Sequence, residues 1–162
     1  MKLKLSLSLL LVSTLSGCTA SGHLYPVRGP LSTETPTPVY KLKIKDALKS
    51  GDISVALDNG ETGKSRWKLV PQDKSPNPAP STNSEATPAA LSQVWDTIYG
   101  PGFYVAKVLG NRLYAQSTIT TNRGTILNVE FYEPDAHANS PEVGAIKGVA
   151  KDNKDNLYKL TF

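Results

Sequence analysis

Few side chains of this 162-residue chain could support acid–base, nucleophilic or metal chemistry. His23 has no second metal-ligating residue at a suitable spacing, and His137 has only Asp135 near it. Glu130 and Glu133 are three residues apart at the end of an expected strand, so they would not share a strand face as a paired acid and base. The motifs G-x-S-x-G, H-E-x-x-H and the P-loop do not occur. These residues predict a protein that is not an enzyme.

The segment 152–156, Asp-Asn-Lys-Asp-Asn, contains enough side-chain oxygens to suggest calcium binding. It lacks the central glycine and the distal glutamate of an EF-hand loop, and Lys154 stands among the candidate ligands. A polar hairpin turn accounts for the segment better. The sequence therefore predicts neither a metal site nor a cofactor.

Cys18 is the only cysteine in the sequence, which excludes an internal disulfide and any site built from several cysteines. Upstream of it are the basic residues Lys2 and Lys4 and an apolar run over residues 5–15. That run is too short for a bilayer span, which needs about 20 apolar residues. A basic start, a short apolar core and small residues behind it are typical of a secretory signal peptide.

The motif Leu15-Ser16-Gly17-Cys18 resembles the lipobox of bacterial lipoproteins, and this resemblance covers residues 1–18 alone. It implies cleavage before Cys18, with a diacylglycerol thioether and an acylated amino group on that residue. Thr19 is not the aspartate that typically retains lipoproteins at the inner membrane of enteric bacteria. The resemblance therefore implies a lipid anchor in the cell outer membrane. It leaves open whether the protein is on the periplasmic face or the surface face. The alternative is an ordinary signal peptide with an incidental cysteine.

Removal of residues 1–17 changes the charge of the chain. The full sequence has a formal net charge of +4, and the leader contains two lysines and no acid, so the mature chain carries +2. Basic residues form no run elsewhere in the sequence, which gives no electrostatic footprint for nucleic acid. The expected partners are the membrane, through the lipid, and an envelope protein or glycan. The oligomeric state stays open.

Prolines divide the mature chain into three parts. They are frequent in residues 18–38, for which we expect a lipidated cysteine and a Pro-rich tether, although 25–31 is apolar enough to lie across the folded domain instead. A second Pro-rich stretch, 71–87, is expected to be a flexible loop. The β-rich domain itself is expected over 39–162.

One short helix is expected after this loop. Thr87-Pro88 provides a capping hydroxyl followed by a proline at the first helical position, and Gly100 ends the helix. Its apolar stripe recurs at helical spacing and consists of Leu91, Val94, Trp95 and Ile98.

Alternating apolar residues and turn signals predict a mainly β fold, a small antiparallel barrel or sandwich of about seven to eight strands joined as a meander. Gly144 and Gly148 suggest bends or a close backbone approach within a strand, and Phe162 is expected in the core. The expected strands are 39–45, 53–57, 63–70, 103–109, 112–120, 125–132, 144–151 and 157–162.

The densest aromatic segment surrounds the end of the expected helix. Trp95, Tyr99, Phe103 and Tyr104 form the candidate binding surface for a glycan or a peptide, although core packing explains most aromatic residues of a small barrel. Trp95 in particular is expected to pack the helix onto the sheet. The function that fits these features is a non-enzymatic structural or binding module of the envelope. The alternatives are a lipid-anchored inhibitor of the lysozyme type, which usually contains internal cysteines, or a carrier of a small ligand.

Overall fold

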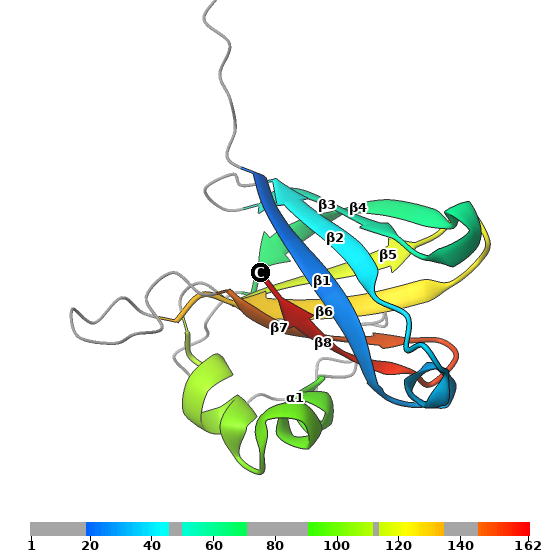
Figure 1. Ribbon diagram of the computed structural model, residues 1–162. Helices are drawn as coiled ribbons and strands as arrows, with labels where there is room; N and C mark the ends of the chain where they lie inside the picture. Colours follow the sequence, from blue (N-terminus) through cyan, green and yellow to red (C-terminus); the bar gives the residue numbers. More distant parts are fainter. Residues whose placement is uncertain (1–18, 46–49, 71–90, 112–113, 135–145) are drawn as a thin grey trace, which may run out of the picture.

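Eight antiparallel strands form a closed barrel in the computed structural model, which describes residues 19–45, 50–70, 91–111, 114–134 and 146–162. Each strand pairs with the next one in the chain, and β8 pairs back with β1, so the predicted meander is confirmed as a barrel (Figure 1). The strands are β1 (Thr19–Arg28), β2 (Tyr40–Lys45), β3 (Ser50–Ala56), β4 (Thr62–Leu69), β5 (Tyr114–Thr120), β6 (Ile126–Tyr132), β7 (Lys147–Asp152) and β8 (Leu157–Thr161).

The first strand replaces much of the expected tether. Residues 19–28 form β1 between β2 and β8, so the prediction of a tether over 18–38 is wrong for them, and the domain begins at Thr19 instead of residue 39. Proline favours the same extended backbone in a tether and in a strand, so composition could not separate the two. Pro26 lies at a register shift in the pairing with β8, where a missing N–H is tolerated. A short 3₁₀ helix, η1 (Pro30–Thr33), follows β1.

The barrel interior is filled by side chains. Small eight-stranded barrels are just wide enough for this, and Gly148 shows how close the packing is. A Cβ at that residue would lie 2.5 Å from Leu160 Cδ2, so the predicted close approach is confirmed. The prediction for Phe162 is wrong: it follows the last residue of β8 and stays 39% exposed. The largest interior side chains are Leu24, Tyr40, Leu42, Ile44, Ile53, Trp67, Ile119, Leu127, Phe131, Tyr158 and Leu160.

A helical segment lies on the outside of the barrel, beside β7 in Figure 1. The helix α1 (Ser92–Tyr99) confirms the predicted element and its end, where Gly100 has a φ of 110°. The predicted start at Thr87-Pro88 lies outside the described residues, as do Cys18, Gly144, His137 and the Pro-rich loop 71–87. No helix within the described residues is both long and apolar enough to cross a membrane.

The predicted strand over 103–109 is wrong, because its residues form a π-helical turn, η3 (Tyr104–Val108). β-branched and aromatic residues favour a strand, but a turn at Gly102 and a contact with α1 favour a helical turn here. Gly102, at a φ of 79°, helps to reverse the chain after α1. Asp96 Oδ1 then accepts a hydrogen bond from the Tyr104 backbone N–H at 3.0 Å and holds η3 against α1.

Candidate functional site

The candidate binding surface is built where α1 and η3 cover the outer face of β5 to β8. Alternation along these strands directs one set of side chains into the barrel and the other set toward the helix. The outward set and the apolar stripe of α1 form a second core outside the barrel. Its buried members are Leu91, Val94, Trp95, Val108, Tyr114, Tyr132, Val149 and Leu157.

Trp95 is the centre of this outer core and is 0% exposed. Its ring lies 5.4 Å from that of Tyr99, 6.0 Å from that of Phe103 and 5.6 Å from that of Tyr132, all measured between centroids. The last contact is edge-to-face and joins the helix to β6. The prediction that Trp95 packs the helix onto the sheet is therefore confirmed, and the side chain is not accessible to a ligand.

The structure brings the other three predicted residues to the same place. Tyr99 and Phe103 stack with centroids 4.7 Å apart, and the Tyr104 ring lies edge-to-face against Tyr114 at 6.3 Å. Tyr99, Phe103 and Tyr104 are partly buried, so each contributes both to packing and to the surface. Lys159 Nζ, 5.3 Å from the Tyr99 centroid, places a positive charge beside these rings.

The burial of Glu130 on β6 is the feature that the sequence analysis missed, since it considered this residue only as a possible acid–base partner of Glu133. Glu130 is 1% exposed, although it points away from the barrel interior. Glu130 Oε2 accepts a hydrogen bond from Trp95 Nε1 at 2.8 Å, and Oε1 accepts one from the Leu91 backbone N–H at 3.3 Å. Strand alternation alone assigns such a residue to solvent. Only the position of the helix over β6 reveals that it is buried.

Burial controls the protonation of this cluster. It raises the pKa of Glu130, and the hydrogen bonds from Trp95 and Tyr114 oppose that effect in part. Burial also raises the pKa of Tyr114 and raises that of Tyr99 to about 12. Both phenols therefore stay neutral near pH 7. The Glu130 carboxyl, enclosed by its own donors, anchors α1 to the barrel and is not open to a substrate.

We predict that this anchor makes stability depend on pH. Because the pKa of Glu130 is raised in the folded state, the free energy of unfolding should fall as pH rises above about 4.5, through the folded pKa. Glu61 does not obscure this range, because hydrogen bonds, first from Thr121, lower its pKa. The measurement is the urea midpoint of unfolding between pH 5 and pH 8. In this range carboxyl groups with unperturbed pKa values are ionised.

The Glu130→Gln variant provides the control for this pH dependence. It cannot ionise, so the fall in its urea midpoint over the same range should disappear. A glutamine has one acceptor oxygen and cannot accept from both Trp95 and Leu91 on separate atoms, so its stability should be lower by about 1–3 kcal/mol. The same pH profile in both proteins would assign the effect to other groups.

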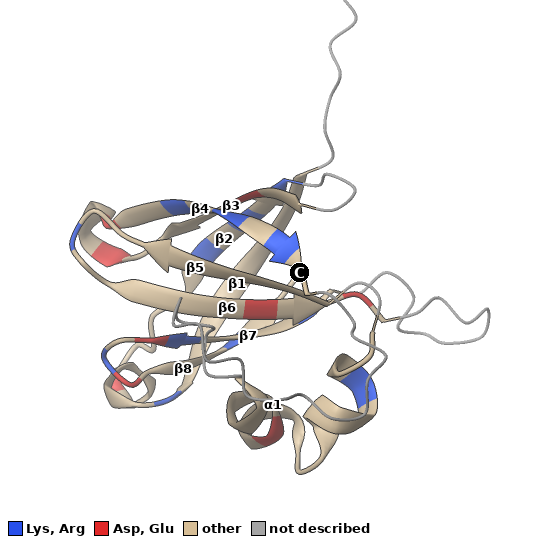
Figure 2. Ribbon diagram, turned by 180° about the vertical axis from the view of Figure 1, so that it is seen from behind, with Lys and Arg blue, Asp and Glu red and all other residues tan. Residues whose placement is uncertain are grey.

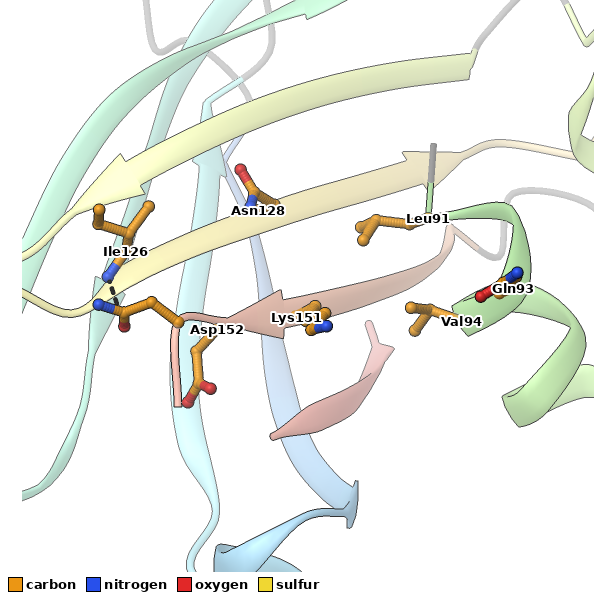
Figure 3. A pocket seen from close by; sticks show the side chains of 8 residues that line it. Leu91, Gln93, Val94, Ile126, Asn128, Lys151 and Asp152 are labelled. Atoms are coloured by element: carbon orange, nitrogen blue, oxygen red, sulfur yellow. Dashed lines mark hydrogen bonds between the residues drawn. The ribbon is translucent and has the colours of Figure 1, made fainter. Parts of the chain in front are cut away.

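A cavity of about 350 Å³ opens beside the start of α1, between the helix and the ends of β6 and β7 (Figure 3). Several polar side chains at its wall already have partners. Asn128 Oδ1 accepts from Thr118 Oγ1 at 2.9 Å, and Asn153 Oδ1 accepts from the Ile126 backbone N–H at 3.1 Å. Lys151 forms an ion pair with Asp155 at 3.2 Å. The polar side chains of this surface hollow therefore bond mainly to neighbouring residues of the barrel.

The hairpin at 152–156 confirms the prediction of a polar turn. Asp152 Oδ1 accepts hydrogen bonds from the backbone N–H groups of Lys154 and Asn156, at 2.8 and 2.9 Å. Asp152 Oδ2 accepts from Asn156 Nδ2 and from the Tyr158 hydroxyl, at 2.8 and 2.7 Å. No group of three or more His, Cys, Asp or Glu suited to a metal ion occurs among the residues that the structure describes. His23 is exposed on the outer face of β1.

The second feature that the sequence analysis missed is a basic side of the barrel. Six exposed lysine and arginine residues on β2 and β4 point outward, and one acid, Asp52 on β3, lies between them. Figure 2 shows the blue segments of these strands on the same side of the barrel. Basic residues at alternate positions do not form a run in sequence, but a strand places them on one face. They are Lys41, Lys43, Lys45, Lys64, Arg66 and Lys68, and we call them the basic face.

Comparison with known proteins found no matching family model, no matching curated protein and no matching solved structure.

Proposed function

We propose that this chain is a lipid-anchored, non-enzymatic lipoprotein of the bacterial outer membrane, in which the barrel is a structural or binding module of the cell envelope. One observation carries the proposal most directly. The first strand begins at Thr19, so Cys18, the cysteine of the lipobox, immediately precedes the barrel in the sequence. Cleavage before Cys18 leaves the described barrel whole, because every strand lies within residues 19–161.

This arrangement determines how the protein meets the membrane. One residue spans at most about 3.6 Å, so lipid on Cys18 holds the barrel end that contains Thr19 close to the headgroups. Three acyl chains on one residue greatly exceed the marginal hold of a single chain. The barrel then lies on the membrane surface, without a spacer between the two.

The filled interior favours a binding surface on the outside of the barrel over the ligand chamber of a carrier. The exposed parts of Tyr99, Phe103 and Tyr104, with Lys159 beside them, offer aromatic and cationic contacts to an envelope glycan or protein. We propose this cluster as the partner-binding surface. Trp95 holds it in place from beneath.

The anchor is tested by metabolic labelling with a fatty-acid analogue. We expect the native protein to incorporate the label and to fractionate with the outer membrane. The Cys18→Ser variant should lose the label completely, since the chain has no other cysteine to receive the thioether.

A second variant tests the location separately from lipidation. Thr19→Asp should keep the label and shift the protein to the inner membrane in an enteric host. Native protein without label would overturn the proposed anchor. Native protein that carries the label but fractionates with the inner membrane would overturn only the outer-membrane location.

A further inference from the structure

We propose that the basic face docks on anionic phospholipid headgroups of the membrane that holds the lipid anchor. The inference deepens the proposed function and rests on it, because the anchor brings this side of the barrel to the bilayer. The lipid then provides attachment, and the basic face determines how the barrel lies on the surface.

Positive and negative charges lie on different parts of the protein, which its small net charge does not reveal. The six residues of the basic face, together with Asp52 between them, carry a net charge of +5. Residues 18–162 carry +2 in total, so the remainder of the mature chain carries −3. An anionic surface attracts the basic face and repels the negatively charged remainder, so the protein turns its basic face toward that surface.

The basic face also lies beside the anchor. Thr19, the residue after Cys18, pairs with Lys45, and Ser21 pairs with Lys43 on the next outward row. At about 3.4 Å per residue, the row from Lys45 to Lys41 extends roughly 14 Å from the anchored end of the barrel. β4 lies two strand spacings from β2, roughly 10 Å away. A lipid on Cys18 thus brings these cations near the bilayer together.

The six side chains are available for headgroups. All are exposed, and none forms an ion pair with another described residue. Arg66 Nη2 donates to Ser50 Oγ at 3.4 Å, at the edge of the face, which leaves its other donors free. Between the two basic strands, β3 presents small side chains, Ser54 among them, so the lysines of both strands can reach one plane.

The expected strength follows from the charge. Each lysine or arginine close to an anionic membrane strengthens binding about five-fold, and this contribution falls off within about a Debye length, roughly 10 Å at 0.1 M salt. Such binding is weak by itself and strong when added to a lipid anchor, as in other two-signal attachments.

The experiment uses the unlipidated chain 19–162, which contains every described strand and helix. The anchor is thereby removed from the measurement, and a circular dichroism melt verifies the fold of each protein. Sedimentation is measured with vesicles of phosphatidylcholine alone and with an equimolar mixture of phosphatidylcholine and phosphatidylglycerol. We expect binding to the mixed vesicles at low salt, and loss of that binding at high salt or without phosphatidylglycerol.

Two triple variants with the same net charge show whether the face is responsible. Replacing Lys43, Lys45 and Lys64 by glutamine should weaken binding to the mixed vesicles on the order of 100-fold. The control replaces three lysines elsewhere on the molecule and should change binding only a few-fold. Its substitutions are Lys107→Gln, Lys151→Gln and Lys154→Gln.

Equal losses in the two triple variants would overturn the proposal, because total charge would then explain the binding. Failure of the native barrel to bind the mixed vesicles, or equal binding to both kinds of vesicle, would overturn it as well. These results are independent of the fatty-acid label. Absence of label on the native protein removes the anchor and leaves the vesicle measurement unchanged.

Discussion

Replacing Trp95 by alanine should lower the free energy of unfolding by about 3–5 kcal/mol, the usual range for loss of a fully buried aromatic side chain. Trp95 contacts two aromatic rings of the helical segment and one on β6, so the variant loses the packing that joins α1 to the barrel. It also removes the Nε1 donor to Glu130, an acceptor buried with it. Urea unfolding, followed by near-UV circular dichroism, measures the effect.

Two controls separate the contributions of Trp95. Trp95→Phe keeps an aromatic ring and loses the hydrogen bond to Glu130, so it should lower stability by about 1–3 kcal/mol. Val105→Ala, on the exposed side of η3, should stay within about 0.5 kcal/mol of the native protein. If Trp95→Ala were as stable as Val105→Ala, the helical segment would not be coupled to the barrel, and the role assigned to Glu130 would be wrong.

Replacing Asp152 by alanine should lower the free energy of unfolding by about 3 kcal/mol. The carboxylate is buried and accepts four hydrogen bonds, including those from the Asn156 backbone and the Tyr158 hydroxyl. Both donors are buried themselves, and each buried donor left without an acceptor costs about 1–3 kcal/mol. Asn156 also accepts the Leu31 backbone N–H at 2.9 Å, so loosening the hairpin should release η1 too. A thermal or urea melt measures the loss.

The matched variants for this hairpin are both asparagines. Asp152→Asn keeps one acceptor oxygen for the backbone donors but turns an N–H₂ group toward Asn156 Nδ2, so we expect a smaller loss than in Asp152→Ala. Asp155→Asn should be close to neutral. Its side chain is 87% exposed, an exposed ion pair with Lys151 contributes little, and asparagine tolerates the φ of 62° at this position. Equal losses for Asp152→Ala and Asp155→Asn would contradict the structural role of the Asp152 carboxylate.

The number of strands was predictable from the sequence, but two of the segments were exchanged. Turn signals such as Asn59-Gly60, both at positive φ in the structure, divide the chain into short antiparallel strands and so predict the meander. The segment 103–109 looks like a strand and forms η3, whereas 19–28 looks like a tether and forms β1. Each outcome depends on a tertiary contact, with α1 in one case and with β8 in the other.

The candidate site was predictable to a similar degree. The helical stripe indicates that Trp95 faces the sheet, because periodicity alone identifies the buried side of an amphipathic helix. The same rule applied to β6 gives the wrong environment for Glu130, since the rule says which face a side chain occupies and not what covers that face. The basic face was missed for a related reason: β2 and β4 contribute to it from separate parts of the chain, and only their pairing with β3 brings them together.

The pairing of β1 with β8 has a consequence for how the protein is made. Leu24 and Leu160 are opposite each other across this seam, although they are far apart in the sequence. In the proposed lipoprotein, which is exported through a membrane, the seam forms only after β8 has been translocated. Closure of the barrel requires two distant segments to meet, and contacts of this kind form slowly. The part of β1 that waits for β8 begins at His23, whereas Thr19 pairs with Lys45 on β2.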